Sequence, residues 1–423
     1  MTAATTPAEP AITVDVAIVG AGLVGGTLAV ALARHGINTL VIDRLDPAAT
    51  FAPAFDGRAS AIAASSQTLL AAIGLWPHLA GSTEPIREIR VSDGDAPFFL
   101  HYDHALLGET PLGFMAENRH YRLAIAKAMA AQREHLTVEA GRAVTGMDDG
   151  PDRITLTLDD GRKIHAQLAV AAEGRDSKLR ELAGIGLTGW SYPQTAIVAT
   201  IGHARPHDSI AHERFLPAGP FAILPLPDDA GVRRSSLVWT ERADAAASYL
   251  ALDDARFLAE IGERVGGFLG ELSLIGPRFS HPLGLQFAAR YSQGRLVLAG
   301  DAAHGIHPIA GQGLNLGLRD VAALTEIIAD TRALGLDLAH PEGLARYERW
   351  RRADNLMMAG VTDVLNRLFS NDIAPLRLAR DLGLAAINRI GPLKKFFMRH
   401  AMGTVGDLPR LMRAPQGQPG RSA

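Results

Sequence analysis

A glycine-rich turn near the N-terminus restricts this chain to a small set of folds. The β-branched run Val14 to Val19 leads directly into Gly20-Ala-Gly22-Leu-Val-Gly25, which matches the spacing G-x-G-x-x-G. A helical segment to about Arg34, a second apolar run at Thr39 to Ile42 and then Asp43 complete a βαβ pattern. Dinucleotide-binding proteins hold the pyrophosphate at such a helix N-terminus and a ribose hydroxyl at such an acid. The pattern predicts a nucleotide-binding sheet and disfavours a purely structural glycine turn.

The same region contains an uncharged run, Val16 to Ala33, about as long as the ~18 residues that suggest a transmembrane helix. Residues 1–15 contain no lysine or arginine, so they lack the positive region of a signal peptide. Four glycines also interrupt the run where a spanning helix would be continuous. We therefore expect a buried strand, a tight turn and a buried helix.

A second glycine-rich stretch, Gly300 to Asp320, reads GDAAHGIHPIAGQGLNLGLRD and follows an apolar run at 295–299. Gly311 and Gly313 allow a flat ligand to approach the backbone without a Cβ in the way. The helix predicted from about Leu314 offers unpaired N–H groups with positive dipole character. The stretch therefore predicts a site for a flat, partly anionic ligand.

A third glycine turn, Glu173 to Arg180, follows an apolar strand and belongs to the same sheet by its strand–turn–helix pattern. From Gly184 to about Arg278, short β-rich runs broken by proline and glycine indicate a separate, inserted sheet. After Asp320 the chain is mostly helical by pattern. We predict an α/β fold with three parts: a discontinuous Rossmann-like nucleotide-binding domain (12–75, 101–183 and 281–340), an inserted, mainly β substrate domain (76–100 and 184–280) and a helical C-terminal region (341–423).

The composition excludes several kinds of site. The chain of 423 residues has no cysteine, so disulfides, thiolate metal sites, iron–sulfur clusters and cysteine nucleophiles are ruled out. His304 and His307 lie three residues apart on a glycine-rich loop without a third ligand, so we assign them to the shape of the loop and predict no metal. The net charge of −3 gives no reason to expect nucleic acid as a partner.

The C-terminal region differs in charge from the rest of the chain. Residues 341–423 contain 14 Lys plus Arg and 7 Asp plus Glu, a net charge of +7, so the remainder carries −10 to give the total of −3. Phe396-Phe397 beside Lys394-Lys395 could form a basic amphipathic face for a bilayer or a partner. The alternative is a solvated basic helix that packs on the core through its apolar stripe.

The three turns together resemble those of the single-component FAD monooxygenases with the para-hydroxybenzoate hydroxylase fold, the class A flavoprotein monooxygenases. Finer details are similar to the UbiH/UbiF/VisC family of FAD-dependent ubiquinone-biosynthesis hydroxylases. The segments that carry this likeness are Phe55-Asp-Gly-Arg58-Ala, Glu117-Asn-Arg119, Leu224-Pro-Leu226 with Val238-Trp239, and Pro409-Arg-Leu-Met-Arg413. Glu173 departs from the superfamily, which more often has aspartate at that position, so its role is less defined than that of Gly174 or Arg180.

The resemblance implies a set of FAD contacts. Gly20, Gly22 and Gly25 would hold the pyrophosphate, Asp43 the adenosine ribose, and Asp301 the ribityl chain or the pyrophosphate side of the flavin. Further predicted contacts are Arg44, Arg58, Arg122, Gly174, Gly313, Leu314 and Asn315, with a surface ion pair as the alternative for Arg58. The predicted catalytic residues are Pro308, Gly311 and Gln312, on the loop against the isoalloxazine. Helix-terminus electrostatics independently predict that the helix start at 313–315 stabilises negative charge on the reduced ring.

The resemblance also implies NAD(P)H as electron donor, O₂ as co-substrate, and a C4a-hydroperoxyflavin that hydroxylates the ring of a polyprenylated phenol. Predicted wall residues of the substrate pocket are Leu224, Pro225, Leu226 and Trp239, although simple sheet core is the stronger interpretation of Trp239. We expect a cytoplasmic enzyme that touches the inner membrane or a ubiquinone-biosynthesis complex. The alternatives are a non-catalytic FAD-binding scaffold or lipid-carrying subunit, and an FAD hydroxylase of a soluble aromatic acid. The ring position, the choice between NADH and NADPH, and the oligomeric state are open at this point.

Overall fold

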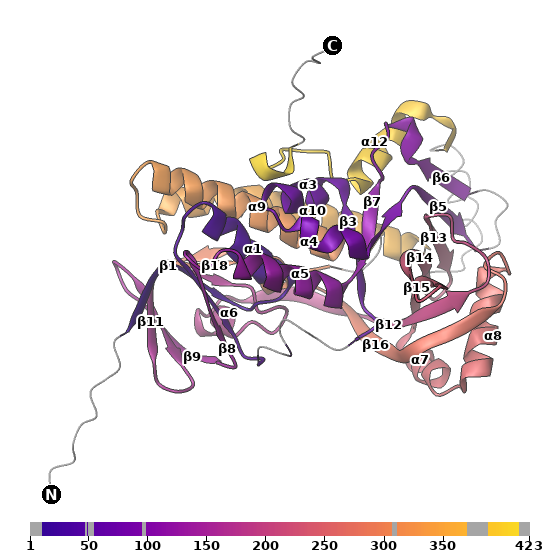
Figure 1. The fold of residues 1–423 in the computed structure, drawn as a ribbon, viewed down its shortest axis with the longest axis horizontal. Helices are drawn as coiled ribbons and strands as arrows, with labels where there is room; N and C mark the ends of the chain where they lie inside the picture. The colour runs from indigo at the N-terminus through magenta and orange to yellow at the C-terminus, as the bar shows by residue number, and fades with distance from the viewer. Residues whose placement is uncertain are drawn as a thin grey trace, which may run out of the picture.

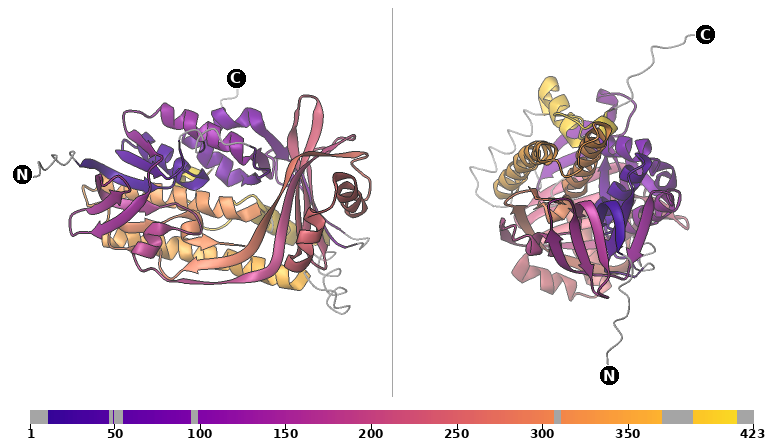
Figure 2. Two further views of the ribbon diagram at one scale, coloured as in Figure 1. Left: turned by 90° about the horizontal axis from the view of Figure 1, so that it is seen from below. Right: turned by 90° about the vertical axis from the view of Figure 1, so that its left-hand side faces the viewer.

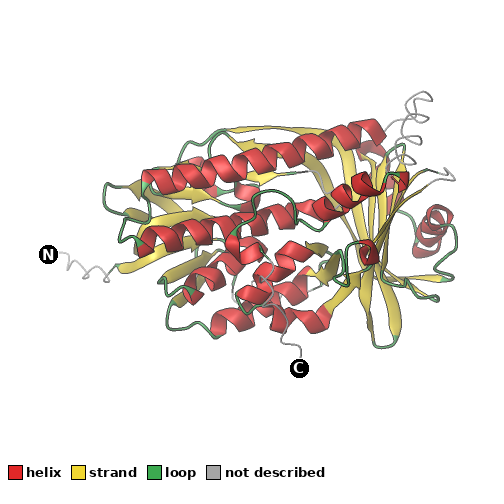
Figure 3. Ribbon diagram, turned by 90° about the horizontal axis from the view of Figure 1, so that it is seen from above, coloured by secondary structure: helices red, strands yellow, loops and turns green. Residues whose placement is uncertain are grey.

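Two eight-stranded sheets and one three-stranded sheet organise the protein (Figure 1). The structure is a computed structural model that describes residues 11–46, 49, 55–94, 99–306, 311–369 and 388–413. In Figure 1 the first sheet lies at the left and the second at the right. Two long helices lie side by side along the length of the molecule (Figure 3).

The first sheet has the order β17–β18–β11–β1–β2–β8, with β18, β11, β1, β2 and β8 parallel. The antiparallel strands β10 and β9 extend it from β11. Val16 to Val19 are buried because parallel strands in such folds are covered on both faces, which requires a continuous apolar run. The strands are β1 (Ile12–Val19), β2 (Thr39–Asp43), β8 (Leu136–Ala140), β9 (Val144–Asp149), β10 (Ile154–Leu158), β11 (Lys163–Ala171), β17 (Ser292–Gln293) and β18 (Leu296–Leu298).

Helix α1 (Leu23–Arg34) accounts for the long apolar run near the N-terminus. It packs between α5 (Asn118–Ala130) and α9 (Gln312–Ala333), and most of its residues are buried. A Cβ on Gly26 would lie 2.6 Å from the Ile125 side chain, so glycine permits the close approach of α1 and α5. The predicted strand, turn and buried helix are confirmed. Within the described part of the chain, each helix is too short or too polar to cross a membrane.

The second sheet has the order β19–β16–β12–β15–β14–β13–β5–β6 and confirms the predicted inserted sheet. Its strands are β5 (Glu88–Asp93), β6 (Phe99–Asp103), β12 (Leu187–His203), β13 (Ile210–Leu216), β14 (Gly219–Asp229), β15 (Val232–Arg242), β16 (Leu272–Ala288) and β19 (His304–Gly305). Strands β12 and β16 have 17 residues each and run as a long pair from one domain into the other (Figure 2). One face of the sheet packs against α7 (Ala243–Leu250) and α8 (Asp254–Val265).

The small sheet lies between the two larger domains. It consists of β3 (Ala59–Ala63), β7 (Gly113–Glu117) and β4 (Thr83–Ile86), followed or flanked by α3 (Ala64–Ala72) and α4 (Trp76–Leu79). Its apolar residues pack against β14, whereas α3 and α4 pack into the core of the first domain.

Strand pairing runs across two of the predicted domain limits. Of the predicted substrate segment 76–100, only β5 and the start of β6 belong to the second sheet, because β4 pairs with β7 instead. Strands β6 and β16 continue through the limits at 100/101 and 280/281. The division into three parts stays a prediction, and its limits are better placed at strand ends.

The C-terminal region is helical, as predicted, in its described part. Helix α10 (Pro341–Phe369) packs on α9, and α12 (Gly391–Ala401) and the short η5 (Arg410–Met412) follow.

A buried carboxylate joins these helices to the second glycine-rich stretch. Asp320 on α9 is 0% exposed. Its Oδ2 accepts a hydrogen bond from the Gly300 N–H at 2.9 Å and lies 2.5 Å from His304 Nε2, while Oδ1 accepts from Arg351 Nε at 2.7 Å. Burial alone would raise the pKa of Asp320, but His304 and Arg351 outweigh it and lower the pKa to about 2. Asp320 is therefore charged and paired from two sides.

The network continues toward the C-terminus. Arg351 Nη1 donates to Asp354 Oδ2 at 2.7 Å, and Arg319 Nη1 donates to the same oxygen at 2.8 Å. Arg319 Nη2 donates to the Gly403 carbonyl at 2.7 Å. These bonds fix α9, α10 and the segment after α12 relative to one another.

We predict that Asp320→Asn lowers the free energy of unfolding by about 3 kcal/mol or more at neutral pH, because fully buried Arg351 would lose one of its two carboxylate partners and keep only Asp354. Urea unfolding of both proteins measures this. The charged form of Asp320 is favoured in the folded state, so its contribution is full above its ordinary pKa of 3.8 and is lost as the pH falls toward 2. The difference between wild type and variant should narrow over that interval, and a difference that does not change with pH would contradict the prediction.

Candidate active site

The first glycine turn combines two glycines that the packing requires with one that faces open space. A Cβ on Gly20, where φ is +103°, would lie 2.4 Å from the Ala172 carbonyl oxygen, and one on Gly25 would lie 1.9 Å from that of Gly20. Gly22 has no atom within 4 Å of a Cβ position, and it begins α1 without a side-chain cap. The free N–H groups of α1 therefore point at a space that suits a pyrophosphate.

Asp43 stands at the end of β2 beside this turn. Its Oδ2 accepts from the Ala21 N–H at 2.6 Å and its Oδ1 from the Leu45 N–H at 2.9 Å. The carboxylate thus holds the glycine turn in place while remaining half-buried at the rim, where a ribose hydroxyl would approach. Arg44 follows it and is exposed.

The third glycine turn, Glu173 to Arg180, gives a structural reason for the glutamate at position 173, where the superfamily more often has aspartate. Glu173 Oε2 accepts from Ser177 Oγ at 2.6 Å and from the Leu179 N–H at 3.1 Å, at the start of α6 (Lys178–Leu182). Ser177 itself caps α6 by accepting from the Arg180 N–H at 3.2 Å. Glu173 therefore caps this helix together with Ser177, and Gly174 between the strand and the cap has φ +87° and open space around it.

Arg175 ties the third glycine turn, Glu173 to Arg180, to the Gly300–Asp320 stretch, a role that the sequence interpretation missed. Its Nη2 donates to the carbonyls of Gly284 at 3.3 Å and Ile306 at 3.4 Å, and its Nε lies 3.8 Å from Asp301 Oδ2. Buried Arg180 adds a bond from Nη1 to the Ala302 carbonyl at 3.0 Å. The only sequence signal for Arg175 was its position within the glycine turn Glu173 to Arg180.

The turn that carries Asp301 packs directly on the start of α1. A Cβ on Gly300 would lie 3.0 Å from the Val24 side chain, and one on Gly317 would lie 2.6 Å from it. These two glycines let η3 (Gly300–Ala302) and α9 approach the first turn of α1. Asp301, in the middle of η3, keeps its side chain half exposed.

The N-terminus of α9 is open toward a ligand. Gly311 begins the helix with φ +61° and no side-chain cap, and Gly313 has no atom within 4 Å of a Cβ position. Leu314 is half-buried. Pro308 and His307 lie outside the described residues. The helix start carries positive dipole character, which can stabilise negative charge on a flat ring.

Asn315 also has a structural task that the sequence did not predict. Its Oδ1 accepts from the Ala63 N–H at 2.9 Å and from Ser66 Oγ at 2.8 Å, and its Nδ2 donates to the Ala61 carbonyl at 2.9 Å and the Gly311 carbonyl at 3.2 Å. The side-chain amide of Asn315 is fully used in locking β3 and α3 to the start of α9.

The predicted phosphate-binding arginines come from adjoining elements. The Asn118 N–H donates to the Arg58 carbonyl at 2.9 Å, which joins the loop before β3 to the start of α5, and Arg122 lies one turn further along α5. Arg58 pairs with Asp56 at 2.6 Å on the exposed surface, as its alternative interpretation proposed. Arg122 makes no ion pair among the described residues, so its charge is available to an anion.

The four predicted wall residues divide between the two faces of β14 and β15. Leu224 and Leu226 pack against Met115 of the small sheet and Met398 of α12. Pro225 points to the other face because strand residues alternate.

Trp239 lies in the core on that other face, with its ring centroid 6.1 Å from that of Phe221 and the Arg264 guanidinium 4.3 Å above its ring. The pocket assignment of Trp239 is therefore corrected to sheet core, because cross-strand pairing places it opposite Phe221 and away from Leu224 and Leu226. Leu224 and Leu226 remain as the predicted wall.

The site as a whole suits a dinucleotide with a flat ring. It offers open space at Gly22, Gly174 and Gly313, two uncapped helix N-termini, and carboxylates at Asp43 and Asp301. This combination, together with the second and mostly antiparallel sheet, is the arrangement expected of the class A flavoprotein monooxygenases that the sequence resembles.

Comparison with known proteins identifies the family to which the chain is similar. The FAD binding domain family matches residues 13–358. Ubiquinone hydroxylase UbiL of Rhodospirillum rubrum is 53% identical over 402 residues, covering 94% of this chain and 92% of that protein. The 3-demethoxyubiquinol 3-hydroxylase of Escherichia coli is 35% identical over 391 residues, covering 92% and 98%. The crystal structure of p-nitrophenol 4-monooxygenase PnpA from Pseudomonas putida shares the fold with a TM-score of 0.76 at 19% identity, covering 92% and 98%.

The chain therefore belongs to the family of FAD-dependent ubiquinone-biosynthesis hydroxylases. The family, the α/β fold with its inserted antiparallel sheet, and FAD as cofactor are confirmed as predicted.

We predict that two glycine substitutions in the first turn separate cofactor binding from folding. Gly22→Ala should leave the apoprotein as stable as wild type, because its Cβ meets no protein atom, and should weaken FAD binding at least about tenfold by filling the pyrophosphate space. Gly25→Ala should destabilise the apoprotein itself, because its Cβ would lie 1.9 Å from a backbone oxygen. Thermal unfolding of both apoproteins and FAD titration test this, and equal stability losses in the two variants would contradict it.

Proposed function

We propose that the protein hydroxylates the aromatic ring of a polyprenylated phenol in ubiquinone biosynthesis, with NAD(P)H as electron donor and O₂ as co-substrate. The names of its two relatives, a ubiquinone hydroxylase and a 3-demethoxyubiquinol 3-hydroxylase, support this substrate class. When bound, FAD supplies the transfer of electrons from the nicotinamide and the activation of O₂. The protein contributes binding, orientation and exclusion of water.

One geometric observation carries the proposal: Ala61 of β3 joins the ring side of the site to the apolar wall. Its carbonyl accepts from Asn315 at the start of α9, and a Cβ on Gly311 would lie 3.1 Å from the Ala61 Cβ. Ala61 also packs against the cluster that contains Leu224 and Leu226. A ring placed against the α9 N-terminus would therefore be separated only by Ala61 from an apolar wall that suits an isoprenoid chain.

Each part of the site then has a proposed role. Gly22 and the α1 N-terminus would bind the pyrophosphate, Asp43 the ribose, and Asp301 the chain between ring and phosphates. The α9 N-terminus would stabilise charge on the reduced ring. Gly311 and Gln312, with Pro308 from the same loop, would position ring and substrate, so we assign them positioning roles rather than proton transfer.

The apolar wall also distinguishes the proposal from its alternatives. A hydroxylase of a soluble aromatic acid needs a cation against the carboxylate. The cation on this face is buried Arg234, the cross-strand neighbour of Leu226, and it already pairs with Glu117 at 3.4 Å. A non-catalytic scaffold would bind FAD without reducing it. We further propose that the protein works in the cytoplasm, in peripheral contact with the inner membrane or a ubiquinone-biosynthesis complex.

The decisive assay uses the purified holoprotein, an octaprenylphenol, and NADH or NADPH in turn. We expect flavin reduction followed by a product heavier by one oxygen in mass spectrometry. A flavin that stays oxidised with both donors would overturn the proposal and favour the scaffold. Turnover of a soluble aromatic acid with no turnover of the prenylated phenol would favour the other alternative.

We predict that Leu224→Ala lowers kcat/KM for the prenylated phenol about tenfold, because one apolar contact with the substrate is lost. Activity with a phenol that lacks the isoprenoid chain should change little. Leu216→Ala is the matched control, since Leu216 is a partly buried leucine that packs into the core on the opposite face of the same sheet. Equal losses in the two variants would argue against Leu224 as a wall residue.

A further inference from the structure

Helix α12 and the residue before it expose an apolar surface that soluble helices seldom leave uncovered. Ile390 and Phe396 are 50% and 51% exposed, and Leu393 and Phe397 are each 36% exposed. The Phe396 ring lies 4.2 Å from that of His400, on the outside of the helix. We refer to Ile390, Leu393, Phe396 and Phe397 as the α12 apolar surface. A helix that is merely solvated has no reason to present two adjacent phenylalanines to water.

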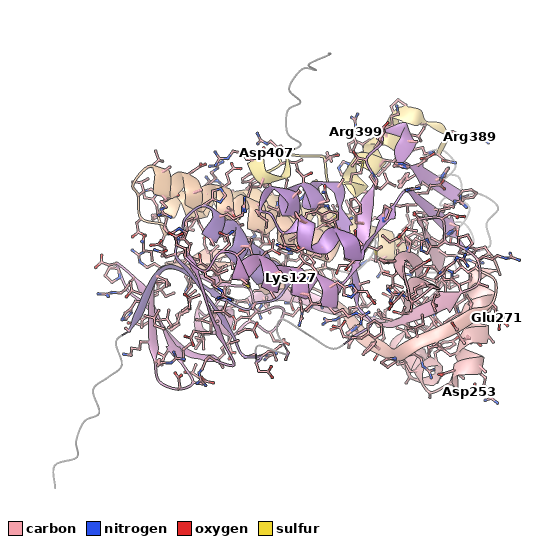
Figure 4. All side chains as sticks on the ribbon, viewed as in Figure 1. Lys127, Asp253, Glu271, Arg389, Arg399 and Asp407 are labelled. Carbon is pink, nitrogen blue, oxygen red and sulfur yellow. The ribbon has the colours of Figure 1, made fainter. Side chains whose placement is uncertain are left out.

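The same segment carries only positive charge. Residues 388–406 contain Arg389, Lys394, Lys395 and Arg399 and no aspartate or glutamate. None of these four cations forms an ion pair among the described residues, and Lys394 Nζ instead donates to the Asn388 side chain at 3.1 Å. Arg389 and Arg399 both lie along the upper edge of the molecule in the view of Figure 4. Four unneutralised cations around apolar side chains match an anionic lipid surface.

The inner face of α12 is continuous with the proposed substrate wall. Met398 and Met402 are buried in the cluster that contains Leu226 and Met115. The helix is also fixed to the first domain, because the Ser65 N–H donates to the Met402 carbonyl at 3.1 Å. One helix thus separates the wall from the exposed apolar surface.

A groove runs beside the exposed face of this helix. It has a volume of about 780 Å³ and lies between α12 and residues 404–406, with Phe396, Lys395 and Arg399 on its sides. Its lining combines apolar atoms with two cations, which suits the boundary between lipid head groups and acyl chains.

We propose that the α12 apolar surface and its four cations bind an anionic bilayer, so that a prenylated substrate passes from the lipid phase to the wall at Leu224 and Leu226 along α12. This inference rests on the proposed function for the nature of the substrate, but not for membrane binding itself. In this arrangement α12 lies in the membrane interface with its axis parallel to the bilayer plane, and Phe396 and Phe397 insert between the lipids.

The test is cosedimentation of the FAD-loaded protein with vesicles of phosphatidylglycerol and phosphatidylcholine in equal amounts. We expect binding that is released by salt and that is absent with phosphatidylcholine alone, because screening removes the electrostatic attraction. Phe396→Ser with Phe397→Ser, and separately Lys394→Gln with Lys395→Gln, should each weaken vesicle binding about tenfold or more. Leu334→Ser with Leu336→Ser is the matched control, because these exposed leucines lie at the turn after α9.

A second readout separates this inference from the proposed function. With prenylated phenol supplied in vesicles, turnover by the phenylalanine variant should fall about tenfold or more, while turnover of a short-chain phenol in solution and FAD content should match wild type. Vesicle binding without any hydroxylation would refute the proposed function and leave the surface intact. Wild type that does not bind anionic vesicles, or variants that bind as well as wild type, would overturn the inference. A wild-type dimer that the phenylalanine variant converts to a monomer would instead assign the surface to a contact between copies of the chain.

Discussion

The buried charge of Asp320 is the interaction on which the rest of the site depends. An isolated carboxylate at a fully buried position is strongly unfavourable, so the fold holds only when a cation and hydrogen-bonding partners reach it. His304 arrives from the loop before α9 and Arg351 from α10, and the Gly300 N–H completes the set. The turn that presents Asp301, α9 and α10 are thereby held together by one side chain.

Much of the nucleotide-binding half could be predicted because its signals are local. A β-branched run, a glycine turn, an apolar helix and an acid after the next strand occur within one short segment, and the structure keeps them in that order. The membrane-length apolar run at 16–33 was interpreted correctly for the same reason, since its glycines lie within the run itself.

The features that were missed depend on contacts between distant segments. Asp320 had a usable signal, because it follows Leu316 and precedes Leu324 by four residues and therefore occupies a core position of the helix. Arg175 had none beyond its motif, since its partners come from β16 and the loop after β18. Sheet core was already the stronger interpretation of Trp239, but its separation from Leu224 and Leu226 depends on the pairing register of β14 and β15. A period of two along one strand does not show which residues of two strands share a face.

The long pair β12 and β16 has a mechanical consequence. Its ladder runs from Leu187 and Ala288 beside the first domain to His203 and Leu272 at the far end of the second, without a loop in between. Rotation of one domain against the other would have to break cross-strand hydrogen bonds or twist the ladder at its two irregular points, near Ser191 and Val198. The strand pair therefore resists a hinge motion between the two domains. Ligand exchange through movement of individual loops and helices is favoured over opening of the whole molecule.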